Sequence, residues 1–579
     1  MTEKNERWET VVLIALAAAI FVGSAGIPAL LDDADSFYAE VARGMNWRHD
    51  WITPYCNSLR YLEKPPLFYW LISLSYTVFR SANEFTARLP TALAVVGLVF
   101  VTVQIGKLLF GSRAGLLAGT ALTASIGMFL FTRIILPDVL FTLMLSLIFY
   151  SFLRWERAER KTGWLMAMYV FTALAVLAKG GIGIVFPAGI LFFTLAISQR
   201  WRDIWRLISV PGILLFLAIA APWHVLIGER NPGFYWFYFV NEHLLRFLGK
   251  RYPMDYGTVP LVPFWLLHIV WLFPWSLYLL TLLRPANFKQ LLADNQGTAL
   301  LPVCWALTIL VFFSFSSRLE YYTVPAFPAM ALLAGAQCWR MWEQKQKWPS
   351  LTLGLVGALI GVSLIVIAAV VSSKTPDTWL KLKDNPDLYV YYLGHLFDLT
   401  SESVLALRTP LALAGIAFGL FLPLHHVAKK PEAKAALLTI GMGIFFVAAN
   451  LAFLIFAPRL TSKPLAEEIS HRSSAEDGSI IVIDGEYEEG CSVAFYSGRT
   501  VMMHNGRSAN LEYGSRYADA PPLFLGDKEL KALWEQSNRR LFLLTFQYKQ
   551  EKLATVISKG KHELARYGDK ILLSNLPDQ

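Results

Sequence analysis

Charged residues are scarce in this 579-residue chain: only 16% are Asp, Glu, Lys or Arg, whereas soluble proteins carry about 25%. The scarcity excludes an ordinary water-soluble protein, because a fold of this size would need a far larger polar surface. Instead, 55% of the residues are hydrophobic, and the mean hydropathy is +0.44. The composition therefore indicates a membrane protein.

Cysteine is also rare, and the four cysteines form no CxxC pair and no zinc-like spacing. Cys304 and Cys338 lie in apolar runs and are expected in the core, whereas Cys56 and Cys491 fall in segments assigned to one side, which leaves a disulfide open. The chain also lacks a Gly-rich phosphate loop and a dinucleotide-binding motif. It has no basic-aromatic patch of the kind that binds nucleic acid, so no nucleic-acid partner is expected.

Apolar runs of roughly 17 to 25 residues recur along the chain, each long enough to cross ~30 Å of hydrocarbon. The first, 8–30, lacks a strongly basic start and is too long for a signal peptide, so we expect a retained anchor. With about thirteen spans, the basic linkers fall on one side, which the positive-inside rule assigns to the cytoplasm. The N-terminus is then inside and the C-terminus outside.

The apolar segment 65–80 breaks this alternation, because counting it as a crossing would move every later basic linker outside. Its Pro-Pro start, its aromatic content and its terminal Arg80 favour a helix in the outer interface. The alternative is a true crossing beside a misassigned neighbour.

The pattern predicts a transmembrane domain, 1–457, and a soluble α/β domain, 458–579, in the outer compartment. The second part contains the β-type runs SIIVIDG, RTVMMH, RLFLLTF and KILLSN and the helical pattern DKELKALWEQSNRR. The outer loops of interest are 32–87, 229–258, 316–320 and 373–404.

Polar clusters in these outer loops need an explanation in a membrane protein. Asp32, Asp33 and Asp35 follow the first span, where they could cap a helix or supply a base or a phosphate-facing carboxylate. Lys64 directly precedes two prolines, so its ammonium is suited to hold a lipid phosphate. The alternative for Lys64 is snorkelling beside a membrane helix.

A third cluster is Glu242, His243 and Arg246, which follows an aromatic run. His243 and Arg246 are three apart and share a helical face. Glu63 and His243 could together bind a divalent ion such as zinc, although two ligands are too few to define a site. Further polar residues lie at 316–322 and at the outer ends of two spans, where isolated charges are usually structural; they include Asp138, Lys179, Arg318 and Tyr322.

These blocks together resemble the GT-C membrane glycosyltransferases, most closely the lipid A aminoarabinose transferase (ArnT) family. The matching motifs are Tyr38-Ala39-Glu40, Trp51-Ile52-Thr53-Pro54, Arg60-Tyr61-Leu62-Glu63-Lys64-Pro65, Lys179-Gly180, Pro222-Trp223, Glu242-His243 with Arg246, Pro274-Trp275, and Phe313-Ser314 with Arg318-Leu319 and Tyr322. The resemblance covers the whole chain, and the order and spacing of the motifs carry it.

The chain departs from the family pattern at two positions. Ala34 stands where the family has its Asp, so either Asp33 or Asp35 takes the catalytic role after a one-residue shift. Arg318 replaces a Lys, which keeps the positive charge but adds a bidentate donor.

The resemblance implies an inverting transferase that moves 4-amino-4-deoxy-L-arabinose from undecaprenyl phosphate to a lipid A phosphate. Lys64, Arg246 and Arg318 would bind the donor phosphate. The residues expected to line the substrate cavity are Tyr38, Arg60, Tyr61, Asp138, Lys179, Glu242 and Tyr322. It further implies a multi-pass protein of the bacterial inner membrane, with its active site facing the periplasm and no required cofactor. The sequence leaves the oligomeric state open, and we expect a monomer.

Two alternatives stay open at the level of the sequence. One is a GT-C enzyme that moves another polyprenyl-linked sugar, such as mannose, to a protein or glycan. The other is a transporter or flippase of a lipid-linked sugar, which predicts mid-span polar residues and broken-helix repeats, and the sequence shows neither.

Overall fold

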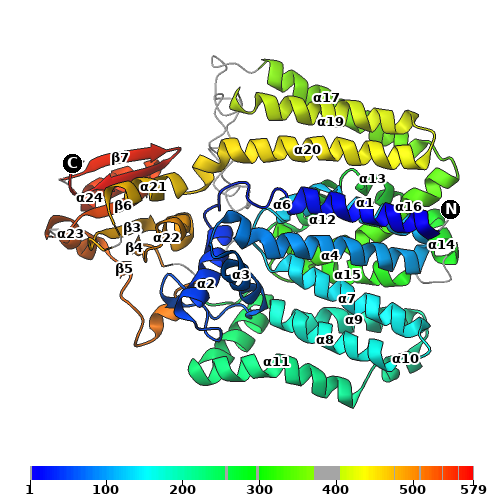
Figure 1. Ribbon diagram of the computed structural model, residues 1–579, viewed down its shortest axis with the longest axis horizontal. Coiled ribbons are helices and arrows are strands. Elements are labelled where there is room, and N and C mark those ends of the chain that lie inside the picture. Colours follow the sequence, from blue (N-terminus) through cyan, green and yellow to red (C-terminus); the bar gives the residue numbers. More distant parts are fainter. Residues whose placement is uncertain are drawn as a thin grey trace.

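The computed structural model describes residues 3–253, 258–294, 299–370, 405–474, 476–507, 510–536, 539–557 and 560–577. Long helices lie side by side in a bundle, and a smaller domain with a sheet covers one end of it (Figure 1). The predicted outer loop 373–404 lies outside the described residues.

Within these ranges, seven helices are long and apolar enough to cross a membrane. They are α4 (Glu84–Phe110), α7 (Asp138–Arg157), α8 (Thr162–Lys179), α11 (Val210–Arg230), α17 (Trp348–Val370), α19 (Arg408–Val427) and α20 (Pro431–Leu460). Four shorter apolar helices are α3 (Leu67–Phe79), α9 (Ile182–Ile197), α12 (Leu261–Trp271) and α15 (Leu300–Ser314). The predicted polytopic helical fold is confirmed, and the count of about thirteen spans stays a prediction.

Two of the apolar runs predicted as single spans, 114–131 and 259–283, are interrupted. The first comprises α5 (Ser112–Thr123) and α6 (Ile126–Phe131), and the second comprises α12, α13 (Ser276–Leu280) and a 3-10 turn at 281–283. Pro274 lies in the second break, where it has no backbone N–H to continue a helix. The remaining helices of the bundle are α1 (Glu3–Phe21), α2 (Ala34–Arg48), α10 (Trp201–Arg206), η1 (Trp236–Leu245), η2 (Thr281–Leu283), α14 (Pro285–Asp294), η3 (Glu320–Ala326) and α16 (Phe327–Glu343).

Helix α3 corresponds to the segment expected in the outer interface. Its 13 residues span about 20 Å, which is less than the ~30 Å hydrocarbon core. With α2 it lies at the end of the bundle that faces the smaller domain (Figure 1). A short hairpin of β1 (Tyr55–Cys56) and β2 (Leu59–Arg60) connects the two helices.

The C-terminal domain is built on a six-stranded sheet of order β5-β4-β3-β6-β8-β7. Strands β3 (Ile480–Gly485), β4 (Met502–Asn505), β5 (Phe524–Leu525) and β6 (Leu541–Phe546) are parallel, and β7 (His562–Tyr567) and β8 (Lys570–Ser574) add antiparallel strands. Its helices are α21 (Lys463–Arg472), α22 (Cys491–Ser497), α23 (Asp527–Gln536) and α24 (Gln550–Val556). Each of the four predicted β runs contains a strand, and α23 occupies the predicted helical pattern.

All four cysteines are buried and free. The disulfide that the sequence left open between Cys56 and Cys491 is therefore not formed in this structure.

Candidate functional site at the outer end of the bundle

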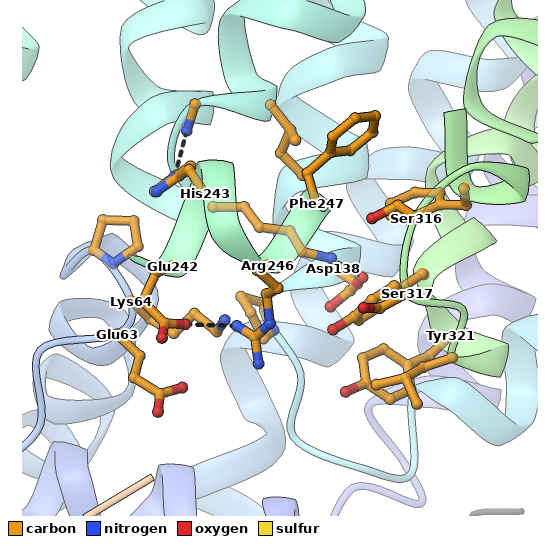
Figure 2. Close-up of a pocket in the computed structure, with 18 of the residues that line it drawn as sticks. Glu63, Lys64, Asp138, Glu242, His243, Arg246, Phe247, Ser316, Ser317 and Tyr321 are labelled. Atoms are coloured by element: carbon orange, nitrogen blue, oxygen red, sulfur yellow. Dashed lines mark hydrogen bonds and ion pairs between the residues drawn. The ribbon is translucent and has the colours of Figure 1, made fainter. Parts of the chain in front are cut away.

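A cavity of about 440 Å³ opens at the end of the bundle that faces the C-terminal domain. Distant segments contribute to its wall: the start of α2, the loop before α3, the adjoining ends of α7, α8 and α9, and η1 (Figure 2). Residues 316–322 complete the opposite side. The predicted site residues that line it are Asp33, Tyr38, Tyr61, Glu63, Lys64, Asp138, Lys179, Glu242, His243, Arg246 and Tyr322.

Of the three aspartates that follow the first predicted span, Asp33 lines the cavity. It is the N-cap residue of α2, yet its carboxylate makes no capping hydrogen bond, and its backbone has a φ of 72°. Such a conformation costs a non-glycine residue about 1–3 kcal/mol and occurs mainly at functional sites. Burial and the neighbouring Asp32 charge raise the pKa of Asp33 to about 7, so this carboxyl can exchange a proton near neutral pH.

Asp35 was the other candidate for the catalytic acid, and the structure corrects this. Its carboxylate forms a fully buried ion pair with Arg88 of α4. It also accepts the backbone N–H groups of Leu31 at 3.0 Å and Ile135 at 2.9 Å. Both oxygens are therefore used in holding α2 against the bundle, away from the cavity.

Lys64 and Arg246 are two neighbouring cations of the cavity wall. Burial, reinforced by the nearby Arg246 charge, lowers the pKa of Lys64 to about 8. Arg246 donates to the Glu242 carboxylate at 2.8 Å, one turn back along η1 (Figure 2). Because two neighbouring cations in a buried site repel each other, an anion bound between them would relieve this repulsion.

Arg251 supports this pair and was missed by the sequence analysis. Its side chain is 1% exposed; it donates to Glu242 at 2.6 Å and forms an ion pair with Glu63. Burial disfavours the charged form of Glu242, but Arg246 and Arg251 outweigh it and hold its pKa below the usual value. The network fixes the loop that carries Lys64 against η1. In the sequence, Arg251 resembles any basic loop residue.

His243 has protein partners on both ring nitrogens. Nδ1 donates to the Tyr238 carbonyl at 2.6 Å, so Nε2 is the acceptor of the Gly181 N–H at 2.9 Å. Gly180, with a φ of 78°, makes room for the ring, because a Cβ there would overlap it. With the Glu63 carboxylate held by Arg251, the proposed Glu63–His243 metal pair has no free histidine lone pair in this arrangement. The described residues also contain no group of three potential metal ligands.

Asp138 and Lys179 form a buried ion pair across the cavity wall. The Lys179 ammonium lies 5.2 Å from the ring centroid of Tyr322, within cation–π range. The pair links α7 to α8 and lines the cavity, and Figure 2 shows Asp138 across from Arg246.

Two predicted binding residues lie outside the cavity wall. Arg60 forms an ion pair with Asp519 of the C-terminal domain and stacks 4.2 Å from the Tyr517 ring centroid. Arg318 donates to the backbone carbonyls of Val259 at 2.8 Å and Ser314 at 3.1 Å. The prediction that Arg60 lines the cavity is therefore wrong for this structure, and phosphate binding by Arg318 stays a prediction.

Asn510 is a cavity residue that the sequence analysis did not identify. It belongs to the C-terminal domain, and its side-chain amide donates to the Glu488 carboxylate at 2.6 Å. No local pattern marks Asn510, because its role arises only when the domain packs on the bundle.

Comparisons with known proteins agree with this architecture. The family described as dolichyl-phosphate-mannose-protein mannosyltransferase matches residues 63–226. An undecaprenyl phosphate-α-4-amino-4-deoxy-L-arabinose arabinosyl transferase of Proteus mirabilis is 26% identical over 86% of this chain and 85% of its own. The crystal structure of ArnT from Cupriavidus metallidurans bound to undecaprenyl phosphate superposes with a TM-score of 0.81, at 22% identity, over 98% of both chains.

The chain has the ArnT-like GT-C fold. The archaeal oligosaccharyltransferase of Archaeoglobus fulgidus shares this fold more distantly, with a TM-score of 0.50 at 11% identity over 96% of this chain and 70% of its own. The resemblance inferred from the motifs is thus confirmed. The cavity lies where the loops at one end of the bundle meet the C-terminal domain.

Proposed function

We propose that this ArnT-like chain is an inverting membrane glycosyltransferase that uses a polyprenyl-phosphate sugar as its donor. One observation carries the proposal: the cavity brings two cations suited to a phosphate, Lys64 and Arg246, together with the Asp33 carboxyl, whose pKa is raised and which makes no capping hydrogen bond. The cations suit the phosphate of a lipid carrier, and the carboxyl suits the acceptor.

The reaction follows from these assignments. An acceptor oxygen attacks the anomeric carbon from the face opposite the donor phosphate, and the bond between that carbon and the phosphate oxygen breaks. The electron pair leaves with the polyprenyl phosphate, whose growing negative charge Lys64 and Arg246 stabilise. Asp33 orients the acceptor. A phosphate acceptor is already anionic, whereas a hydroxyl acceptor would transfer its proton to Asp33.

The name of the Proteus mirabilis relative supports 4-amino-4-deoxy-L-arabinose as the sugar and undecaprenyl phosphate as the carrier. We propose a lipid A phosphate as the acceptor. The enzyme then resides in the bacterial inner membrane with its cavity on the periplasmic side, where no nucleotide sugar is needed. It acts as a monomer and needs no cofactor for this chemistry.

A second candidate is transfer of another polyprenyl-linked sugar, such as mannose, to a protein. It is favoured by the match of residues 63–226 to the mannosyltransferase family. That segment contains Glu63, Lys64, Asp138 and Lys179, which would bind the donor in either case, so this match does not discriminate between acceptors.

Purified enzyme incubated with undecaprenyl-phosphate aminoarabinose and lipid A tests the proposal directly. We expect mass spectrometry to detect lipid A with one added aminoarabinose. Polyprenyl-phosphate mannose with a mixture of periplasmic proteins serves as the competing substrate pair. Transfer only in that second reaction would overturn the aminoarabinose assignment, and transfer in neither would overturn the proposed activity.

A further inference from the structure

The loop that carries Asp33 is held by the C-terminal domain on several sides. The N–H of Asp33 donates to the carbonyl of Glu488 at 2.9 Å, and the thiol of Cys491 lies 3.3 Å from the Asp33 carbonyl. The preceding residue, Asp32, donates its N–H to the Leu460 carbonyl at 2.9 Å. The unusual backbone of Asp33 is therefore fixed by partners from the other end of the chain.

The Asp32 side chain is the centre of this contact. One oxygen accepts the backbone N–H of Ser492 at 2.8 Å, and the other accepts the hydroxyl of Ser462 at 2.7 Å. Lys570, the first residue of β8, completes the set with a direct ion pair. The side chains of Lys570 and Asp32 are 2% and 6% exposed, so this pair is almost completely shielded from water.

Asp32 and Asp33 are adjacent and have different surroundings. Asp32 points into the C-terminal domain, where Lys570 neutralises it, and Asp33 points into the cavity. A buried ion pair with hydrogen bonds at every oxygen fixes geometry, because either partner alone would be an unpaired buried charge. Fixing Asp32 also fixes the direction in which the next side chain leaves the backbone.

We propose that Lys570 and Asp32 are positioning residues of the active site, through which the C-terminal domain holds the Asp33 carboxyl in the cavity. The inference rests on the proposed transferase activity and deepens it. Neither residue touches the cavity, and both act through Asp33.

The pH at which Asp33 ionises provides a readout that a purely structural role of Lys570 and Asp32 would not change. The groups that face Asp33 are Asp32 on its own loop and Glu486, Glu488 and Cys491 of the C-terminal domain. Asp32 and Glu486 raise the pKa of Asp33. Without Lys570, the Asp32 charge is no longer compensated, so ionisation of Asp33 should require a higher pH. Without the Asp32 charge, it should require a lower pH.

The experiment measures sugar transfer, donor KM and the pH profile for purified full-length variants. We expect Lys570→Met to lower kcat by about 10- to 100-fold, because a displaced catalytic group costs on this order. The donor KM should stay within about twofold of the wild-type value, because the phosphate residues belong to other elements. The acidic limb of the profile should move to higher pH.

Lys570→Arg should restore most of the activity, and Asp32→Asn should move the acidic limb to lower pH. Lys531→Met, at an exposed position of α23 in the same domain, is the matched control and should behave as wild type. If Lys570→Met does not fold, the double variant Asp32→Asn with Lys570→Met removes both charges and keeps the test, with an acidic limb below that of wild type.

Wild-type kcat and an unmoved acidic limb in folded Lys570→Met, or in the double variant, would overturn the positioning role. The role would also be overturned if all variants lost kcat equally and the acidic limb did not move in opposite directions in Lys570→Met and Asp32→Asn. That result would indicate general destabilisation. Failure of the proposed function is distinguishable, since the wild-type enzyme itself would then transfer no sugar.

Discussion

The α17–α19 helix pair and the cavity region at the end of the bundle that faces the C-terminal domain are held together by different kinds of contact. In the helix pair, Gly361 meets Gly415 and Gly419 so closely that a methyl group on Gly361 would overlap the facing backbone. Lipid is as apolar as the side chains it replaces, so membrane helices associate through such close fits of small residues. Shape alone explains this contact.

Around the cavity, ion pairs between buried side chains make the contacts instead. Arg251, Glu63 and Glu242 are almost completely buried, and Asp138 pairs with Lys179 across the wall. Buried ion pairs contribute little net stability, yet removal of one partner is costly. Charged residues inside a membrane protein are costly and usually functional, so their concentration at one end of the bundle marks that end as the candidate site. Substitutions in the two regions should consequently have different kinds of effect.

The largest expected effect is that of Asp33→Asn. If Asp33 orients a phosphate acceptor or takes the proton of a hydroxyl acceptor, sugar transfer should fall by about 10²–10⁴-fold, the range that positioning and general-base catalysis contribute. Thermal unfolding in detergent should be unchanged, because the carboxylate makes no capping hydrogen bond. Transfer at the wild-type rate would remove Asp33 from the mechanism.

Asp35→Asn should act on stability instead. It leaves Arg88 as an unpaired buried cation, which costs about 3–5 kcal/mol of unfolding free energy. Thermal and denaturant unfolding of the purified variant measure this loss, and any folded fraction should still transfer sugar. A stable but inactive Asp35→Asn would reverse the roles assigned to the two acids.

Loss of either phosphate-binding cation should weaken donor binding. Lys64→Ala and Arg246→Ala each remove a charge-assisted hydrogen bond of about 1.5–3 kcal/mol, equivalent to roughly a 10- to 100-fold change in affinity. Binding of undecaprenyl phosphate to the purified variants provides the measurement. Lys250→Ala, an exposed lysine near η1, is the matched control. Unaltered affinity in both variants would mean that the phosphate binds elsewhere.

A smaller effect is expected in the glycine-packed helix pair. Gly361→Ala should destabilise the fold by about 1–3 kcal/mol, because the added methyl group overpacks the contact with α19. Gly443→Ala in α20 is the control, since a Cβ there meets nothing within 4 Å. Melting temperatures of the two variants provide the comparison, and equal values would contradict the close packing.

The smallest effect is a narrow pH optimum. As pH falls through about 7, Asp33 gains a proton and transfer declines; as pH rises through about 8, Lys64 loses its proton and donor capture declines. The profile of kcat/KM should therefore be bell-shaped, with limbs near these values. A flat profile between pH 6 and about 9 would contradict both assignments.

Hydropathy and motif order predicted the fold class and the charged residues of the cavity wall, because long apolar runs and polar loops are local properties of the sequence. The individual partners were less predictable. Asp33 and Asp35 are two residues apart, and only the buried Arg88 of α4 distinguishes the structural acid from the cavity-facing one. Arg318 is cationic and close to the cavity in sequence, yet backbone carbonyls use its guanidinium.

Long-range packing explains the residues that were missed. Arg251 matters because it joins Glu63 and Glu242, which are far apart in the chain. Asn510 reaches the cavity only through the packing of a separate domain. Neither contact leaves a periodic pattern, so a single sequence contains no local signal for them.

The wide turn of η1 has a consequence for how this site can vary. As a π-helix, it accommodates an extra residue in each turn, and the Arg246 N–H bonds back to Asn241, five positions earlier. Deletion of one residue before Glu242 would let the segment rewind to 3.6 residues per turn, which would swing Arg246 around the axis with its chemistry unchanged. The number of residues between the aromatic run and Arg246 is therefore as important for the site as the presence of the arginine. A homologue with one residue fewer in that interval would need another cation to hold its lipid phosphate.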